Sequence, residues 1–208
     1  MLSVGYPCSY TPSHCCRQTP APDGSGASTY LDGFYAASLL RSTNAAAFET
    51  LKNAVFRYRY LDAETGWHIE AEGPIIETDD FRRGKGGEEI LTGVRHNDLD
   101  RIGALPPWDV QERGSDAVDA WYSDVASALD AWDEIVNDSA NRITVGLSAG
   151  DTVVIHNRRV MHGRESFTLG GGGERTIVGC YTSAEDLESR WRGLFVKHEE
   201  AENRGGDR

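Results

Sequence analysis

A chain of 208 residues, 39% of them hydrophobic and 26% charged, has the size and composition of one globular domain. Its net charge of −12, from 33 acidic and 21 basic residues, argues against binding along a phosphate backbone and so against a nucleic-acid partner. No apolar run approaches the roughly 18 residues that cross a bilayer and no targeting segment is visible, so we expect an intracellular protein, cytoplasmic or mitochondrial, without a membrane partner.

Residues 1–27 form an N-terminal segment that shows neither helical nor strand periodicity. Prolines and the stretch Asp23-Gly24-Ser25-Gly26 dominate it, so we expect disorder. Three of the four cysteines lie here, but there is no Cys-x-x-Cys pair, which favours free thiols in a reducing compartment over a zinc or redox motif.

Regular structure is expected from residue 28 onward. Residues 28–31 are typical of a short strand, 34–40 of a helix, and a second helix follows in which apolar residues recur at helical spacing up to 55. Residues 56–60 alternate aromatic and cationic side chains, which predicts a half-buried strand. Extended segments are predicted at 67–71 and 75–76, and an exposed loop over 81–88.

The clearest helix of the sequence begins after Gly114, with Ser115 or Asp116 as its N-cap. Its apolar side chains from Val118 to Trp132 fall on one face, which indicates packing rather than chemistry. From residue 142 the pattern is that of strands again, at 143–147, 152–156, 159–162 and 176–181. We therefore predict a mainly β, jelly-roll-like sandwich with inserted helices, followed by a disordered charged tail over 197–208.

Two residues of this region form a candidate binding site. A strand, a turn and a returning strand would bring His162 and Arg175, thirteen residues apart, into one cavity. An imidazole is a good ligand for Fe(II), and a guanidinium binds a carboxylate at two points. Spacing alone leaves open that His162 is a buried core histidine and Arg175 a surface residue of a strand.

Several stretches, in chain order, carry a family resemblance. They are Leu31-Asp32-Gly33-Phe34-Tyr35-Ala36-Ala37, Arg95-His96-Asn97-Asp98-Leu99-Asp100-Arg101, Trp121-Tyr122, the run 157–167 from Asn157 to Phe167, and the block from Gly179-Cys180-Tyr181 to Ser189-Arg190-Trp191-Arg192. Together they resemble the C-terminal part of the trimethyllysine dioxygenase and γ-butyrobetaine dioxygenase family, which is TauD/TfdA-like. The resemblance implies a double-stranded β-helix (jelly roll) that is partial and truncated at its N-terminus, with a dioxygenase domain over 28–196 and residues 1–27 unmatched.

The resemblance also implies roles for individual residues. His162 would be an iron ligand, Arg175 and Ser28 would hold 2-oxoglutarate, and Asn97 and Tyr181 would line the substrate site. A tyrosine ring attracts a quaternary ammonium by about 0.5–2 kcal/mol. The alternatives are that Asn97 caps a turn and that Tyr181 packs at the end of a strand.

A complete iron site needs two histidines and one carboxylate. In the family, the first two ligands come as His-x-Asp upstream of the segment that matches Leu31 to Phe34, and we expect no His-x-Asp string anywhere in this chain. His68-Ile69-Glu70 lies downstream, where we interpret it as an ordinary strand. We therefore expect this chain to lack the His-x-Asp half of the iron site and to be inactive alone.

Three functions remain open at this stage. The first is hydroxylation of N6-trimethyllysine, a small trimethylammonium amino acid of carnitine biosynthesis, with Fe(II), 2-oxoglutarate and ascorbate, and with a homodimer as one arrangement of the protein. The second is the same chemistry on γ-butyrobetaine. The third is a non-catalytic β-sandwich fragment that binds a carboxylate through Arg175, or nothing.

Overall fold

The computed structural model describes residues 2–3, 10–11, 26–148, 150–166 and 180–205. The strands in these ranges are β1 (Leu2–Ser3), β2 (Tyr10–Thr11), β3 (Ser28–Asp32), β4 (Val55–Asp62), β5 (Trp67–Gly73), β6 (Ile76–Arg83), β7 (Glu89–Val94), β8 (Arg101–Leu105), β9 (Ile143–Val145), β10 (Val160–Arg164) and β11 (Thr182–Ser183). The helices are α1 (Gly33–Thr43), α2 (Ala45–Asn53), α3 (Trp108–Glu112), α4 (Ser115–Asn137), the 3-10 turn η1 (Ser139–Asn141) and α5 (Ala184–Gly205).

The sheet that positions the candidate site has the strand order β1-β10-β3-β9, and every neighbouring pair in it is antiparallel. In its register, His162 of β10 lies opposite Tyr30 of β3, and Met161 lies opposite Leu31. Because successive side chains of a strand point to opposite faces, this register separates the sheet into two faces.

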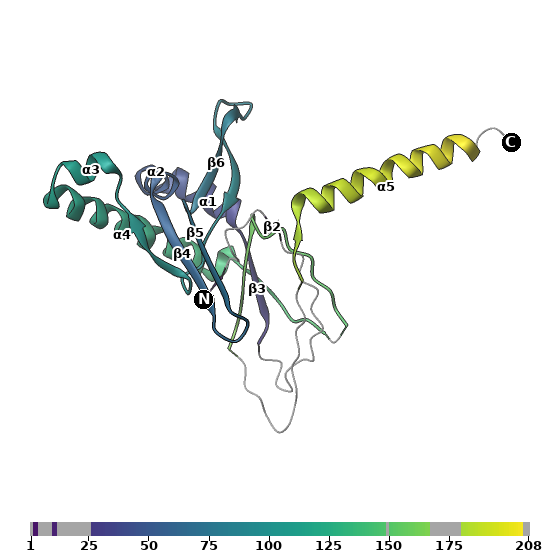
Figure 1. The fold of residues 1–208 in the computed structure, drawn as a ribbon, viewed down its shortest axis with the longest axis horizontal. Helices are drawn as coiled ribbons and strands as arrows, with labels where there is room; N and C mark the ends of the chain where they lie inside the picture. Colours follow the sequence, from purple (N-terminus) through teal and green to yellow (C-terminus); the bar gives the residue numbers. More distant parts are fainter. Residues whose placement is uncertain (1, 4–9, 12–25, 149, 167–179, 206–208) are drawn as a thin grey trace, which may run out of the picture.

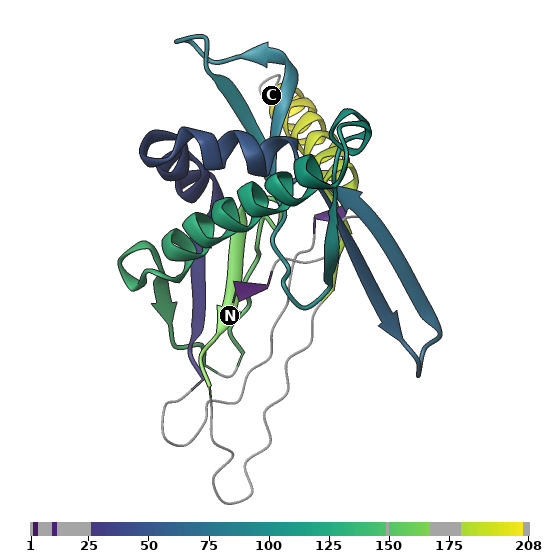
Figure 2. The ribbon, with the colours of Figure 1, turned by 90° about the vertical axis from the view of Figure 1, so that its left-hand side faces the viewer.

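One face of this sheet joins the main hydrophobic core. Leu31 and Met161 are almost fully buried there, together with apolar residues of α1, α2 and α4. Figure 2 shows these three helices gathered in one group, with β3 and β10 leaving it side by side. His162 and Tyr30 are on the other face, which is only partly covered by the described residues.

Helix α4 is the largest contributor to the core among the helices. Its side chains Val125, Ala128, Trp132 and Val136 recur every three or four residues and are buried. This is the face that the sequence predicts. Its N-cap is Gly114, with no side-chain cap bond, rather than Ser115 or Asp116. Gly114 has a φ of +94°, a left-handed conformation that favours glycine.

The junction between β3 and α1 explains the Asp32-Gly33 pair in the first family stretch. The Asp32 carboxylate accepts hydrogen bonds from the backbone N–H groups of Phe34 and Tyr35 and so caps α1. The Gly33 N–H donates to the Arg159 carbonyl at 2.7 Å, and a Cβ at Gly33 would lie 2.7 Å from that same oxygen. The close approach of two backbones therefore requires glycine here.

Two further sheets lie beyond the helices (Figure 1). One has the order β5-β4-β8 and the other pairs β6 with β7. One face of the β4–β5 hairpin carries a surface ladder of opposite charges, in which Arg57 pairs with Glu72 and Arg59 with Glu70. Such exposed pairs contribute less than about 1 kcal/mol each.

Helix α5 extends away from the rest of the described chain (Figure 1). It continues to Gly205, whereas the sequence predicts disorder from residue 197. Its apolar side chains are exposed, and Trp191 and Leu194 are 71% and 65% accessible. Glu188 and Arg192 form an ion pair at i, i+4, and such pairs stabilise a helix that has few tertiary contacts.

Other expectations differ from the structure in detail. Residues 152–156, predicted as a strand, form no strand, and β6 extends to Arg83 inside the predicted loop. Helix α2, capped by Asn44, ends at Asn53, whereas the helical spacing in the sequence continues to Val55, which begins β4. Within the segment 1–27, predicted to be disordered, β1 and β2 pair with β10 and β11. The predicted strand 176–181 lies largely outside the described residues.

Across the residues that the structure describes, no helix combines the length and the apolar character that crossing a bilayer would demand.

Candidate functional site

His162 lies in β10, on the face of the sheet that points away from the helical core. Its ring is half-buried, and Nε2 lies 3.2 Å from the side-chain oxygen Oδ1 of Asn157. The core histidine interpretation would place the imidazole among the buried apolar residues, where Met161 lies instead. The strand therefore presents the imidazole toward the partly open side of the sheet.

Ser28 is on the same face as His162. It lies opposite Arg164, two residues along β10 from His162, so Ser28 and His162 are diagonal neighbours, which in antiparallel sheets are about 7–8 Å apart. The Ser28 side chain is buried, with 7% of its surface accessible. The sheet register thus places one imidazole and one buried hydroxyl on the same face.

Arg175, the other half of the predicted pair, lies outside the described residues. Tyr181 is described and lies directly before β11, with 53% of its surface exposed. Partial burial raises the pKa of the Tyr181 phenol, and the nearby Tyr60 phenol raises it further. The ring is therefore neutral over the physiological range, and two aromatic side chains from distant parts of the chain lie near each other.

Asn97 is buried, and its amide takes part in a local turn. Its Nδ2 donates to the Asp100 carboxylate at 2.5 Å, and its Oδ1 accepts from the backbone N–H of Leu99 at 3.1 Å. This is the turn role that was kept as the alternative for Asn97. An amide nitrogen has two protons, so the contact with Asp100 accounts for one of them.

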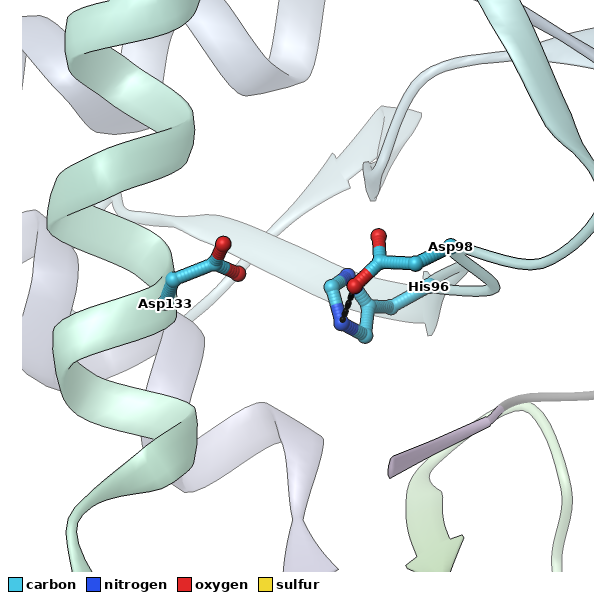
Figure 3. A group of neighbouring side chains, drawn as sticks. All are labelled: His96, Asp98 and Asp133. Carbon is cyan, nitrogen blue, oxygen red and sulfur yellow. Dashed lines mark ion pairs between the residues drawn. The ribbon is translucent and has the colours of Figure 1, made fainter. Parts of the chain in front are cut away.

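The expectation that the chain lacks a His-x-Asp string needs correction. Residues 96–98 read His-Asn-Asp, inside the second family stretch. The structure places His96 and Asp98 beside Asp133 of α4, with ligand-type atoms of all three within 4.8 Å of one another (Figure 3). The string was visible in the sequence, but Asp133 joins it only through the packing of α4, which sequence spacing does not reveal.

The protonation of His96 argues against a metal centre in this cluster. The Trp132 indole can only donate, and its Nε1–H lies 3.2 Å from Nδ1 of His96. The proton of the neutral ring is therefore on Nε2, which faces Asp98 Oδ2 at 3.4 Å. A ring that points an N–H at the carboxylates offers them a hydrogen bond and offers no lone pair to a metal.

Burial and charge set the pKa values of this cluster. Burial lowers the pKa of His96 and so keeps the ring neutral. Burial, and then the negative charge of Asp98, raise the pKa of Asp133, whose Oδ1 is buried without a hydrogen-bond donor among the described residues. Arg101 lies 2.8 Å from Asp98 and compensates its charge. The cluster is thus a buried polar network that fixes the 96–101 turn against α4.

The other His-x-acid string that the sequence analysis considered, His68-Ile69-Glu70, lies in the exposed ladder of the β4–β5 hairpin. His68 Nε2 is 3.1 Å from Glu70, which also pairs with Arg59. Its strand character agrees with the prediction. Within the described ranges, neither His68 nor His162 belongs to a group of three metal-binding side chains.

A polar cavity of about 400 Å³ lies between α2 and the β6–β7 hairpin. Its lining includes Lys52, Glu77, Asp80 and Glu89, and it contains none of the residues that the sequence predicts for the site. Lys52 pairs with Glu89 across it at 3.1 Å. We assign this cavity no role in the chemistry of His162.

Comparison with known proteins identifies a family. The model of the taurine catabolism dioxygenase TauD, TfdA family matches residues 9–181. The match begins inside the segment 1–27, which the sequence analysis set apart as unmatched. It includes His162, Ser28, Asn97 and Arg175.

Among curated relatives, a mitochondrial trimethyllysine dioxygenase of Bos taurus is 30% identical over 195 residues, which is 92% of this chain and 40% of the relative. The γ-butyrobetaine dioxygenase of Homo sapiens is 25% identical over 182 residues, which is 87% of this chain and 42% of the relative. The chain therefore spans about two fifths of the length of these relatives.

Solved structures agree in fold. A taurine dioxygenase from Burkholderia xenovorans superposes with a TM-score of 0.58 at 12% identity, over 87% of this chain and 57% of that one. AAD-2 in complex with Mn(II) and N-oxalylglycine gives a TM-score of 0.58 at 13% identity, over 88% of this chain and 59% of that one. The described sheets and helices are thus arranged as in these two proteins.

Proposed function

Because this chain belongs to the TauD, TfdA family of taurine catabolism dioxygenases, we propose that it carries the distal part of an Fe(II)- and 2-oxoglutarate-dependent hydroxylase acting on N6-trimethyllysine. The trimethyllysine dioxygenase of Bos taurus is 30% identical over most of the chain, and the butyrobetaine enzyme of Homo sapiens 25%. The butyrobetaine branch is therefore the second candidate.

The observation that carries this proposal is the shared face of His162 and Ser28, opposite the helical core. His162 would provide one iron ligand, and the buried Ser28 hydroxyl would assist Arg175 in holding the distal carboxylate of 2-oxoglutarate. The guanidinium fork of an arginine fits a carboxylate at two points. The imidazole on this face would be one of the three protein ligands of a facial iron site.

The bound metal, Fe(II) kept reduced by ascorbate, would supply the oxidation chemistry: one O2 is consumed, one of its oxygen atoms enters succinate as 2-oxoglutarate loses CO2, and the other forms the hydroxyl group on an unactivated carbon of the substrate. The chain's own contribution is to hold the substrate. Tyr181 would offer the trimethylammonium group a neutral aromatic ring, worth about 0.5–2 kcal/mol. Asn97 would donate the second proton of its amide to the substrate carboxylate. This requires the turn at 96–101 to stay fixed, and the contact of His96 with Asp98 favours that.

Three wider properties follow from the same proposal. The sheets would form part of a double-stranded β-helix. The protein would be located in the mitochondrion, as the name of the bovine relative states for that enzyme, or in the cytoplasm. A homodimer is the oligomeric state to test.

We also propose that this polypeptide is inactive alone. The family resemblance assigns it one iron ligand, His162, and the ring of His96 presents a proton rather than a lone pair to Asp98. One imidazole does not hold Fe(II) in the geometry of a facial triad.

A chimera tests the proposed function. The region of the bovine relative that aligns with this chain is replaced by the aligned part of this chain, and succinate and hydroxylated product are measured in air with Fe(II), ascorbate and 2-oxoglutarate. We expect turnover of N6-trimethyllysine in preference to γ-butyrobetaine, and turnover at background level in His162→Ala. A folded chimera that prefers γ-butyrobetaine would replace the first candidate with the second. Equal turnover in His162→Ala would contradict the role of this residue.

The chain by itself is tested under the same conditions. We expect no more succinate than from its own His162→Ala variant. Succinate above that control would overturn the proposed inactivity while leaving the family assignment in place.

A further inference from the structure

Tyr60 in β4 is an aromatic side chain that the family resemblance does not assign to any role. In the register of the β4–β5 hairpin it lies opposite Ile69. Alternate residues of a strand share a face, so Tyr60 lies on the face that carries Phe56 and Tyr58. Phe56 and Tyr58 are almost fully buried in the core, whereas Tyr60 is only partly buried. This face of the hairpin therefore continues past the end of the hydrophobic core.

The same part of β4 holds the segment that contains Asn97. The Tyr58 hydroxyl donates a hydrogen bond to the Arg95 carbonyl at 3.4 Å. The backbone N–H of Arg59 donates to the Asp100 carbonyl at 2.7 Å. The Asp100 carboxylate in turn accepts a hydrogen bond from the Asn97 amide. Both ends of this segment are thus fixed to β4.

Tyr181 approaches the same strand from a distant part of the chain. It directly precedes β11, and 53% of its surface is accessible. Burial raises the pKa of its phenol, and the Tyr60 phenol is near enough to raise it further. Strand β4 is therefore attached to the segment of Asn97 and lies near Tyr181, the two residues that the resemblance assigns to the substrate site.

A trimethylammonium group is suited to more than one aromatic partner. Its positive charge is spread over methyl groups, which are attracted to the negative faces of aromatic rings. Several rings around one such cation form the aromatic cages that bind choline and methylated lysine. Tyr60 and Tyr181 supply two rings on the side of β4 to which the segment of Asn97 is fixed.

We propose that Tyr60 is a substrate-binding residue whose ring, together with that of Tyr181, receives the trimethylammonium group of the substrate. The inference rests on the proposed function, because that function supplies a substrate with this group. It names a contact that the family resemblance does not assign.

The first test uses the chain without metal and with choline as the probe. Choline carries a trimethylammonium group, and its methyl protons give one sharp NMR signal. We expect nuclear Overhauser effects from these protons to the rings of both Tyr60 and Tyr181, assigned with the variants Tyr60→Phe and Tyr181→Phe. Effects at Tyr181 alone would overturn the inference and leave the proposed function standing. Effects at neither ring would contradict the roles of both residues.

The second test separates the charge of the ligand from its shape. The carbon analogue of choline, in which a tert-butyl group replaces the trimethylammonium group, has the same shape without the charge. Tyr60→Leu keeps an apolar side chain but removes the aromatic face, so we expect choline to bind about 2–30-fold more weakly and the analogue to be affected much less. Tyr60→Phe keeps the ring and should bind choline as the wild type does.

Tyr35→Leu is the matched control, because Tyr35 is as exposed as Tyr181 (53%) and lies in α1, outside the hairpin. It should leave both affinities unchanged, and thermal melts of all variants show whether the fold is kept. An unchanged choline affinity in Tyr60→Leu, or equal losses for choline and its analogue, would overturn the inference.

The chimera described for the proposed function supplies a kinetic test. With N6-trimethyllysine as the substrate, Tyr60→Leu should raise KM about 2–30-fold and leave kcat within about twofold of the wild type. A lowered kcat with an unchanged KM would mean that Tyr60 only supports the site, and the inference would be wrong. If no form of the chimera turns over N6-trimethyllysine, the proposed function is wrong, and the choline experiments still decide whether Tyr60 binds a trimethylammonium group.

Discussion

Two histidines, His96 and His162, lie in the stretches that carry the family resemblance. Their hydrogen-bond partners differ. Trp132 can only donate, so it forces the proton of His96 onto Nε2. Nε2 of His162 lies 3.2 Å from the side-chain oxygen of Asn157, on the face of the sheet that points away from the helical core. The ring of His96 is thereby part of a buried hydrogen-bond network, whereas that of His162 is only half-buried.

A substitution of Asp133 tests the assignment of His96 to a buried hydrogen-bond network. Its pKa is raised above the usual 3.8 by burial and by Asp98, so the folded state holds its proton more tightly than the unfolded state. Asp133 therefore costs stability at neutral pH, and this cost disappears as the pH falls below about 4. We expect Asp133→Asn to raise the melting temperature at pH 7 and to leave it unchanged at pH 3.5.

The matched measurement adds a divalent metal ion. If His96, Asp98 and Asp133 bound a cation, Zn²⁺ or Mn²⁺ would raise the melting temperature of the wild type but not of Asp133→Asn. That result would contradict the tautomer derived from the Trp132 contact.

At the scale of elements, the start of α1 combines a cap, an ion pair and a close backbone approach. Asp32 caps the helix and binds the Arg159 guanidinium through both oxygens, with Nε at 3.1 and 3.2 Å and NH2 at 2.6 Å from Oδ2. The hydrogen bond from Arg159 is the main reason that the pKa of Asp32 is lowered. This junction ties β3 to the turn that presents Asn157.

Asp32→Ala removes both functions of the carboxylate. We expect it to cost about 1–2 kcal/mol, of which the cap accounts for about 1, measured by urea denaturation. Asp32→Asn keeps a cap acceptor and should cost less than about 1 kcal/mol. Because the folded pKa is lowered, the ionic part is present above pH 3.8 and is lost as the pH falls through the lowered value. An equal cost for the two variants at pH 7 would show that the cap contributes nothing.

Gly33→Ala tests the backbone approach at the same junction. The new Cβ would lie 2.7 Å from the Arg159 carbonyl, which is backbone and cannot move aside cheaply. We expect a loss of about 1–3 kcal/mol in the free energy of unfolding. Gly146→Ala is the control, since no atom of the described residues lies within 4 Å of its added Cβ, and it should change stability by less than about 0.5 kcal/mol. Equal effects of the two substitutions would contradict the steric argument.

Sequence patterns predicted the elements that depend on local periodicity. The faces of α1, α2 and α4 and the strands β3, β4 and β5 follow from it. Residues 152–156 show the limit of this method, because a run of β-branched residues forms a strand only beside a partner, and Val154 is 70% exposed instead.

The candidate site could be predicted only in part, because some of its contacts depend on how distant segments of the chain pack together. The resemblance identified Ser28 and His162, which the register then placed on one face. Asn157 was part of a quoted stretch, but its contact with His162 depends on how the turn is held by distant strands. The approach of Asp133 to His96 depends on helix packing across 37 residues of sequence, for which a single sequence contains no signal.

At the scale of the molecule, helix α5 presents an exposed apolar face. Leu187, Trp191, Leu194 and Phe195 are all more than half accessible on this projecting helix. Contiguous apolar surface of this kind binds hydrophobic dyes and favours aggregation.

We expect the double variant Trp191→Gln and Leu194→Gln to bind less of the dye ANS and to aggregate more slowly than the wild type, with a melting temperature within about 2 °C of it. Few described elements pack against α5, so stability should not depend on these side chains. The control is Trp108→Gln, which removes an equally exposed tryptophan (72%) from the short helix α3. A melting temperature lowered by more than about 5 °C in the double variant would mean that α5 belongs to the cooperative fold.

The alternation of faces in β10 also predicts which kinds of genetic change this region tolerates. Lengthening or shortening the turn at 156–159 by one codon would exchange the directions of Met161 and His162, so that a thioether would occupy the open face and an imidazole the apolar interior. Deletions and insertions should therefore be selected against here even where point substitutions are neutral. A library of single-codon indels across 150–166, sorted for soluble expression, would map that intolerance.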